Sequence, residues 1–543
     1  MSTYLSKLLF TVHRLKAHHL LLMVGIAFGV ILLTWQALST STITYDDGIS
    51  YLAATGHQGL YWTERPDAQW VLAGQWQSFW TPAEFGSFKK ISHDLALYDI
   101  HPPLYFWALH VWTHVVGVQL SAGPLLNIIF LVLAALFIYL TAIELRCTPW
   151  SATTASLLWL LSGSTLSADT VVRQYSLLGL AVAFYFFSLI RFLNARQLVS
   201  TKLSILSSFY IFLAIIIGLL THYQFIVVLG CASLLAAFIL IKAKDYAGFV
   251  KLSMISFSSL IVSIMLHPNF YHSFIRQQSQ AQDFDWGSLS WRLEKIFTTL
   301  VQIFAPSYGY GFTLFVVITT LLSVIVCVRL TLFLRQKTNR DLFYQLPHEH
   351  WLPLASACLI SFIVFTLYAF SFTPAHAMST IYINVLTPVY FIFIAQLLNF
   401  WQLKFKLFTP FFFACLLGWQ AAYGIYVAYL YSINEAKKHK VIEMLQTNTP
   451  IILDSVARGV LPTFIWHVNN DAQVYAASQE DILNNFPSID VSNKKSILYI
   501  SDSRDGNNAK NRETIINYLS KKGYQIKYKI NVYDYSSLQL LEK

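Results

Sequence analysis

Charged side chains are scarce in this chain. Only 12% of its 543 residues are Asp, Glu, Lys or Arg. A soluble globular protein carries about 25% of such residues, so the composition excludes an ordinary soluble protein. The hydrophobic share of 56% instead predicts a chain that crosses a membrane several times.

Several signals of other protein classes are also missing. The five cysteines lie in or next to apolar segments and form no CxxC pair, which excludes a disulfide framework. There is no glycine-rich phosphate loop, and the lack of internal repeats counts against a transporter built from inverted halves. The net charge of +10 does not indicate nucleic acid as a partner, because Lys and Arg lie in short loops between apolar segments.

Eleven apolar stretches are long enough, at about 20 residues, to cross a bilayer as helices. They lie near 20–40, 121–144, 150–167, 171–193, 203–221, 223–241, 250–266, 311–334, 351–372, 380–400 and 407–430. The clusters of Lys and Arg fall on one side if residues 102–118 form an amphipathic helix in the membrane surface. We therefore predict an all-α membrane region with eleven spans, a cytoplasmic N-terminus and a long first outer loop with interfacial helices.

The composition changes to that of a soluble protein after about residue 431. Short apolar runs at 450–454 and 496–501 predict buried strands, and 512–522 predicts a helix that ends at Gly523. Residues 524–533 alternate as a strand does. We predict two domains, a membrane module over 1–431 and a small extracytoplasmic α/β domain over 432–543.

Three polar stretches fall on the predicted outer face, at 44–48, 99–104 and 169–175. Their candidate functional residues are Asp46, Asp47, Asp99, His101, Asp169, Arg173 and Tyr175. The outer loop also carries four tryptophans between 61 and 80, which predict either an aromatic belt at the membrane surface or a stacking surface for sugar rings.

The acidic pair has two interpretations. Asp47 precedes Gly48 and can cap a short helix, which is a structural role. Alternatively, Asp46 or Asp47 is a general base that deprotonates an acceptor hydroxyl, while the other carboxylate holds the acceptor, a metal or its neighbour. Two adjacent carboxylates raise the pKa of one of them, which suits a base.

The other two stretches add a histidine and an arginine. Pro102 and Pro103 fix the entry to the amphipathic helix, whereas His101 can donate to a phosphate or sugar oxygen, with Asp99 orienting it. Arg173 either snorkels to the surface, pairs with Asp169 at i+4, or binds a lipid-phosphate leaving group. His110 and His114 have i, i+4 spacing but lack a third ligand, so a polar helix face is expected there.

The order of these motifs resembles the GT-C superfamily of integral-membrane glycosyltransferases. The similarity is greatest to bacterial relatives of the protein O-mannosyltransferases and of the lipid A aminoarabinose transferase. Asp46-Asp47 matches the family's Asp-Glu pair, with Asp for the usual Glu, and 98–105 matches its His-Pro-Pro-Leu-Tyr segment. Residues 169–175 resemble its Glu-x-x-Arg-x-Tyr segment, with Asp169 for Glu and one more residue before Arg173.

The resemblance implies single-displacement transfer from a polyprenyl-phosphate-linked sugar to an acceptor hydroxyl on a glycan, lipid or protein. It also implies Asp46 as the leading base, a location in the bacterial inner membrane, contact with membrane lipids, and no nucleotide cofactor, with a divalent metal as an option. Relatives often carry an Arg-Tyr pair where a late membrane span begins at the outer face. The corresponding residues of this chain are 379–384, and they include no Arg. Either His376 or a residue of the 267–310 loop substitutes for this Arg, or the donor binds differently. A transporter or flippase of lipid-linked glycans, and a non-catalytic surface protein, are the alternative functions.

Overall fold

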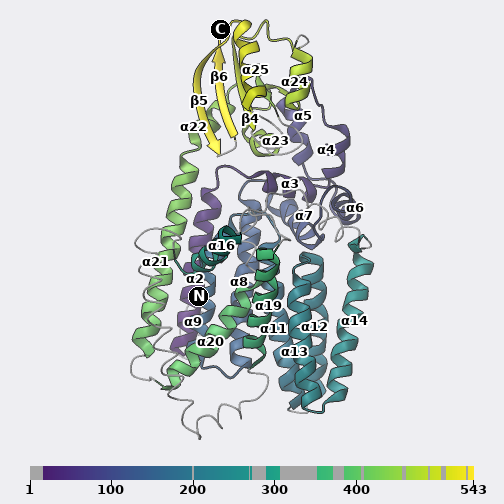
Figure 1. Ribbon diagram of the computed structural model, residues 1–543, viewed down its shortest axis with the longest axis vertical. Coiled ribbons are helices and arrows are strands. Elements are labelled where there is room, and N and C mark those ends of the chain that lie inside the picture. Colours follow the sequence, from purple (N-terminus) through teal and green to yellow (C-terminus); the bar gives the residue numbers. More distant parts are fainter. Residues whose placement is uncertain are drawn as a thin grey trace, which may run out of the picture.

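A bundle of long helices and a small mixed sheet occupy opposite ends of the molecule in the computed structural model (Figure 1). The structure describes residues 16–197, 201–267, 269–271, 289–305, 351–370, 385–404, 409–454, 460–486, 489–502, 509–533 and 536–543. The long helices are α2 (Ala17–Ser39), α8 (Ala122–Glu144), α11 (Tyr175–Gln197), α12 (Thr201–Thr221), α13 (Phe225–Lys242), α14 (Tyr246–Leu266), α19 (Trp351–Phe370), α20 (Thr387–Lys404) and α21 (Thr409–Ala436). Shorter helices of the bundle are α9 (Pro149–Leu160), α10 (Gly163–Asp169) and α16 (Leu289–Gln302).

Within the described ranges, seven helices are long and apolar enough to cross a membrane. They are Ala17–Ser39, Ala122–Glu144, Tyr175–Gln197, Leu203–Thr221, Phe225–Lys242, Tyr246–Leu266 and Thr409–Leu445. The prediction of a multi-pass helical membrane protein is thereby confirmed. The predicted span at 311–334 lies outside the described residues, and the total of eleven stays a prediction.

The stretch 150–167 does not form the one continuous helix that was predicted, because α9 and α10 are separate helices with a break at Leu161 and Ser162. Whether this broken stretch crosses the membrane stays a prediction. The Ser162 hydroxyl accepts a hydrogen bond from the Thr165 amide at 3.3 Å, and the Thr165 hydroxyl donates to the Trp159 carbonyl at 2.8 Å. Such local side-chain bonds compete with the backbone bonds of a helix. The break allows α10 to carry Asp169 toward the first outer loop.

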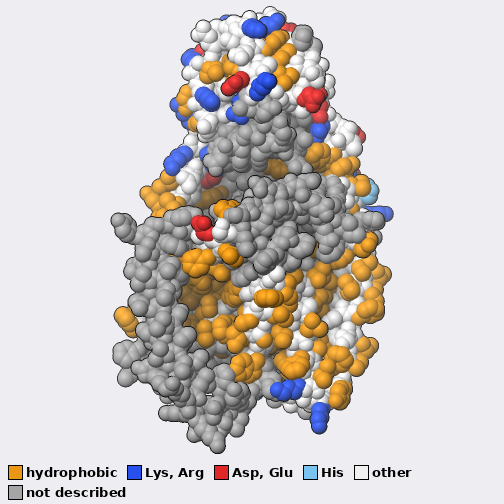
Figure 2. All heavy atoms as spheres, viewed as in Figure 1, with side chains coloured by type: hydrophobic (Ala, Val, Ile, Leu, Met, Phe, Trp, Pro, Cys, Tyr) orange, Lys and Arg blue, Asp and Glu red, His pale blue; other side chains and the backbone are white. Residues whose placement is uncertain are grey.

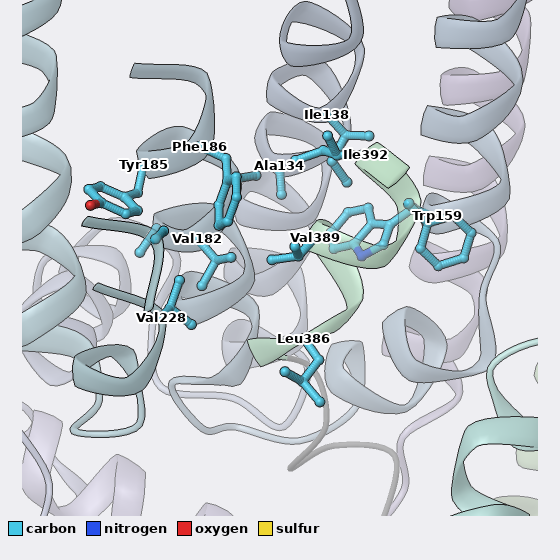
Figure 3. Packing of buried hydrophobic residues seen from close by; sticks show 14 of the residues in the cluster. Ala134, Ile138, Trp159, Val182, Tyr185, Phe186, Val228, Leu386, Val389 and Ile392 are labelled. Atoms are coloured by element: carbon cyan, nitrogen blue, oxygen red, sulfur yellow. The ribbon is translucent and has the colours of Figure 1, made fainter. Parts of the chain in front are cut away.

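The bundle is held together by an apolar core that joins helices distant in sequence. Figure 3 shows Ala134 and Ile138 of α8 and Phe186 of α11 near Ile392 of α20. Trp159 of α9 is fully buried in the same cluster.

Basic residues gather at the end of the bundle away from the sheet. Arg191 and Arg196 of α11 pair there with Glu144 at 3.0 Å and Asp245 at 2.5 Å. Figure 2 shows apolar side chains over the helices, with Lys and Arg at that far end and charges of both signs on the opposite domain. The distribution fits the predicted orientation, with this end in the cytoplasm, and the orientation itself stays a prediction.

The first outer loop folds into a layer of short elements between the bundle and the sheet (Figure 1). They are α3 (Tyr45–Ala54), α4 (Gln58–Glu64), β1 (Trp70–Leu72), α5 (Ala73–Gln77), η1 (Ser78–Trp80), α6 (Phe88–Tyr98) and α7 (Leu104–Val116). Helix α7 has 13 residues, which is shorter than a membrane span, and its Val111 and Val115 are exposed. An interfacial position for α7 stays a prediction.

The C-terminal region forms the predicted α/β fold. Its elements are α22 (His439–Leu445), β2 (Ile451–Leu453), α23 (Val460–Phe464), η6 (Ile465–His467), β3 (Gln473–Ala476), α24 (Gln479–Asn485), β4 (Ser496–Asp502), α25 (Ala509–Lys521), β5 (Gln525–Tyr533) and β6 (Ser536–Glu542). The strand order is β1-β3-β2-β4-β6-β5, and β2 is parallel to both β3 and β4. The strands expected at 450–454, 496–501 and 524–533 and the helix expected at 512–522 are confirmed.

One strand of this sheet comes from the first outer loop. Trp70, Val71 and Leu72 of β1 pair in antiparallel fashion with Tyr475, Val474 and Gln473 of β3. Strand β1 was not predicted from the sequence, because three residues show no periodicity and the pairing partner lies about four hundred residues later. The division at residues 431 and 432 stays a prediction, and the sheet ties the two predicted parts together.

The C-terminal region also packs directly on α3, the helix that carries the acidic pair. A side chain at Gly48 would place its Cβ 2.7 Å from the Pro462 carbonyl oxygen of α23. The rings of Tyr51 and Trp466 lie 5.1 Å apart between their centroids. Two of the four outer tryptophans are core residues here, since Trp76 and Trp80 are 0% and 5% exposed. Burial therefore replaces both surface roles expected for these two tryptophans.

Glu435, near the end of α21, fastens the segment that leads into α3. Its carboxylate accepts hydrogen bonds from the Ser41 amide at 2.9 Å and the Thr42 amide at 3.1 Å, and it pairs with Lys438 at 2.6 Å. We expect Glu435→Ala to lower the melting temperature of the detergent-purified protein, because each buried amide left without an acceptor costs about 1–3 kcal/mol. Glu435→Gln keeps an acceptor oxygen, so its melting temperature should fall by less.

The matched control is Glu443→Ala, at an exposed position of α22. If Glu435→Ala and Glu443→Ala have the same melting temperature, the hydrogen bonds from Glu435 to Ser41 and Thr42 do not stabilise the protein.

Candidate active site

Helix α3 begins with a capping box built by Thr44 and Asp47. The Asp47 amide donates to the Thr44 hydroxyl at 3.3 Å, and Asp47 Oδ2 accepts from the Thr44 amide at 2.9 Å. Asp47 Oδ1 accepts from the Val172 amide at 2.7 Å, across 125 positions of sequence. Asp47 is 3% exposed, and burial raises the pKa of its carboxyl group. The structure therefore gives Asp47 the helix-start role and makes it a link between two of the three stretches.

Asp46, one residue earlier, has a different environment. Its side chain is 53% exposed, and its Oδ1 accepts a hydrogen bond from Arg173 Nη2 at 2.8 Å. The accessible carboxylate of Asp46 could approach an incoming hydroxyl, whereas both oxygens of Asp47 are already bonded. Of the two carboxylates, Asp46 is therefore the one that a substrate can reach.

Asp99 and His101 form a pair at the entry to α7. Asp99 Oδ1 accepts from the Ile100 amide at 2.6 Å and makes a short hydrogen bond with His101 Nδ1. Burial alone would raise the pKa of Asp99, but His101 and the Arg173 guanidinium together hold that pKa well below its usual range. Asp99 is therefore ionised and orients the His101 ring, as expected from the spacing.

Arg173 connects all three stretches. Its Nη2 binds Asp46, and its Nη1 lies 3.9 Å from Asp99 Oδ2. The arginine is 7% exposed, and Nη1 makes no hydrogen bond among the residues that the structure describes. The site therefore contains a buried cation with one donor nitrogen still to be satisfied.

The turn before Arg173 is held by Asn127 of α8. The Asn127 side-chain amide donates to the carbonyl oxygens of Asp169 at 3.0 Å and Val171 at 2.8 Å, and its Oδ1 accepts from the Tyr105 hydroxyl at 3.2 Å. Asn127 was not among the residues predicted from the sequence. The only feature that marks it there is a single polar amide side chain in the otherwise apolar first half of α8.

Asp169 does not pair with Arg173, so the i+4 ion pair considered from the sequence is wrong. Arg173 turns instead toward Asp46 and Asp99, because it lies in the loop between α10 and α11 and not on a continuous helix. Asp169 is fully buried, and neither carboxyl oxygen has a hydrogen-bond partner within the described ranges. Burial raises the pKa of Asp169 well above its usual range, which favours a neutral carboxyl group.

Two remaining predicted residues differ in their placement. Tyr175 begins α11 and lies at the site, where its ring centroid is 5.9 Å from that of His222. His376 and the 379–384 stretch fall outside the described residues.

His222, on the turn between α12 and α13, was not among the residues predicted from the sequence. The only feature that marks it in the sequence is a histidine in a short turn between two apolar stretches.

In the part of the chain that the structure describes, no group of three or more His, Cys, Asp or Glu side chains is placed to hold a metal ion. His110 and His114 contact backbone carbonyl oxygens, at Ala54 and at His110 itself, with distances of 2.7 and 2.8 Å. These two histidines therefore hold the outer layer together.

Comparison with known proteins identifies the architecture. No protein-family model matches the chain, and no curated protein matches it. A solved structure of ArnT from Cupriavidus metallidurans bound to undecaprenyl phosphate is similar, with a TM-score of 0.53 and 10% sequence identity, over 95% of this chain and 97% of that one. The apo form of the same protein gives a TM-score of 0.50 and the same identity and coverage.

ArnT is the lipid A aminoarabinose transferase of the GT-C superfamily, so the resemblance expected from the three motifs is confirmed at the level of structure. The share covered in both chains includes the C-terminal sheet as well as the bundle. This chain has the ArnT-like fold.

Proposed function

We propose that this protein is a membrane glycosyltransferase that moves a sugar from a polyprenyl-phosphate donor to an acceptor hydroxyl. The reaction takes place at the outer face of the bacterial inner membrane. Asp46 is the base, and Arg173 binds the phosphate. The neighbour of similar fold supports the donor class, because its structure holds undecaprenyl phosphate.

The observation that carries this proposal is the contact between buried Arg173 and exposed Asp46 at 2.8 Å. An arginine fork binds a phosphate through two parallel hydrogen bonds, and Nη1 lacks a hydrogen bond among the described residues. A carboxylate within reach of the same cation places a base next to the leaving group.

The chemistry follows from these two groups. Asp46 takes the proton of the acceptor hydroxyl while the oxygen of that hydroxyl bonds to the anomeric carbon of the sugar. The bond from that carbon to the phosphate oxygen breaks, and polyprenyl phosphate leaves with the electron pair. Arg173 stabilises the negative charge that grows on the phosphate in the transition state.

Phosphate and Asp46 compete for the same guanidinium. Arg173 already faces two carboxylates, Asp46 and Asp99, so a bound phosphate would weaken the Asp46 contact by repulsion. Asp46 would then be released toward the acceptor. In this scheme the donor binds first and frees the base.

A divalent cation is a further proposed partner. The Asp46 and Asp99 carboxylates offer the oxygen ligands that such hard cations prefer. A loss of transfer in the presence of a chelator, restored by adding the cation back, would support this role.

The test is transfer of label in membranes that contain the protein and a radiolabelled pool of polyprenyl-phosphate sugars. We expect label to move from the lipid fraction to an acceptor only where the protein is present. If the labelled lipid instead changes sides with its sugar intact, the protein is a flippase and the transferase proposal is wrong. If neither occurs with any donor in the pool, a non-catalytic role replaces both.

A further inference from the structure

His222 lies at the candidate site, although it belongs to none of the three motifs. It follows the last residue of α12, and its amide donates to the Gly218 carbonyl at 3.1 Å. The residue is 4% exposed. The centroid of its ring lies 5.9 Å from that of His101 and 5.9 Å from that of Tyr175. It thus stands between two of the predicted substrate-binding side chains.

The backbone decides which ring nitrogen carries the proton. His222 Nδ1 accepts a hydrogen bond from the Gln224 amide at 3.1 Å. A neutral imidazole that accepts at one nitrogen carries its hydrogen on the other. Nε2–H is therefore a donor on a ring that the turn itself holds in place.

His222 stays uncharged at working pH. Burial, together with the neighbouring His101 and Arg173, lowers its pKa to about 3. Because Nδ1 is occupied and the ring resists protonation, the side chain cannot serve as a base. It can only give a hydrogen bond.

Two donors at this site can serve a ligand. Arg173 Nη1 makes no hydrogen bond among the residues that the structure describes, and the Gln224 amide occupies Nδ1 of His222, which leaves Nε2 as the donor of that ring. The two residues are linked through His101 and Asp99. The His101 ring lies 5.9 Å from that of His222 and bonds Asp99, and Asp99 Oδ2 lies 3.9 Å from Arg173 Nη1. A cationic donor beside a neutral donor suits an anionic oxygen, and hydrogen bonds to charged groups are about twice as strong as those between neutral groups.

We infer that His222 is a further donor-binding residue, whose Nε2–H donates to a phosphate oxygen of the polyprenyl-phosphate group beside Arg173. The inference rests on the proposed function and adds a residue from the turn between α12 and α13 to the phosphate site. Since the ring is neutral, it holds the phosphate without adding charge to the site.

Binding can be measured without turnover, so the test is thermal stabilisation of the detergent-purified protein by undecaprenyl phosphate. Undecaprenol, the same lipid without phosphate, is the ligand control. His222→Phe keeps a ring of similar size but removes the donor, and we expect its half-saturating concentration of undecaprenyl phosphate to rise about tenfold or more. His222→Gln places an amide N–H near the Nε2 position and should recover part of this loss.

The matched control is His93→Phe, because the His93 side chain is 66% exposed on α6. It should bind as the wild type does. The effect of His222→Phe should be equal at pH 6 and pH 8, since the imidazole is neutral at both. If His222→Phe does not fold, His222→Asn, whose amide is too short to reach the same position, takes its place.

The outcomes separate this inference from the proposed function. If the wild type is stabilised by undecaprenyl phosphate and His222→Phe needs the same concentration, the His222 assignment is wrong and the donor class stands. If the wild type does not distinguish undecaprenyl phosphate from undecaprenol, the proposed donor is wrong and the His222 assignment falls with it.

Discussion

Asp46→Asn should reduce sugar transfer by about 10²–10⁴-fold, the usual contribution of a positioned general base, while the protein remains folded. The side chain is 53% exposed, and its contact with Arg173 can be kept by the amide oxygen. The loss should appear in the rate of transfer at saturating donor, measured per amount of folded protein in labelled membranes. Little change is expected in the melting temperature.

Asp47→Asn is the matched comparison, because it makes the same chemical change one residue away. The Asp47 carboxylate accepts hydrogen bonds from the Thr44 and Val172 backbone amides. An Asn side chain at this position has one acceptor oxygen, so its NH₂ group would face a backbone N–H and part of the helix cap would be lost. We expect a clear fall in melting temperature, at a cost of about 1–3 kcal/mol. Should Asp47→Asn abolish transfer with its stability intact while Asp46→Asn remains active, the two roles are reversed.

Arg173→Ala should lower transfer by about 10²–10³-fold, as expected for removal of a group that stabilises charge in the transition state. The substitution also leaves Asp99 without its nearby guanidinium, although His101 and the Ile100 amide still bind that carboxylate. The effect on activity should therefore exceed the effect on stability. Transfer rate and melting temperature, measured on the same preparation, separate the two.

Two further variants show whether the arginine acts through its charge or through its fork. Arg173→Lys keeps the charge but cannot bind a phosphate through two parallel hydrogen bonds. Its transfer rate should therefore lie between those of Arg173→Ala and the wild type. Arg65→Ala is the control, because Arg65 pairs with Asp67 at 2.9 Å in the same outer loop. Full activity of Arg173→Ala would remove the phosphate-binding role from the proposal.

Local sequence patterns were sufficient for the class of the protein and for much of its architecture. Long apolar stretches have few structural solutions in a membrane, because lipid offers the backbone no hydrogen-bond partners. A short apolar run likewise predicted β4, alternation predicted β5, and Gly523 predicted the end of α25, whose last residue is Lys521. These features depend on residues that are close together in the chain.

The sequence by itself also determined the set of candidate residues, because short motifs at fixed offsets can be compared with those of a family. It placed Asp46, Asp99, His101 and Arg173 on one face through the distribution of positive charge alone. The structure then brought these four side chains into contact or near contact.

Only the tertiary structure separated Asp46 from Asp47 and assigned the partners of Arg173. Neighbouring residues on a helix point in different directions, so their burial depends on what packs against each side. The Val172 amide that engages Asp47, the β3 partner of β1 and the His222 turn come from segments far apart in sequence. No local pattern records such meetings, because they are decided by how the helices pack and by where the outer loop lies between the bundle and the sheet.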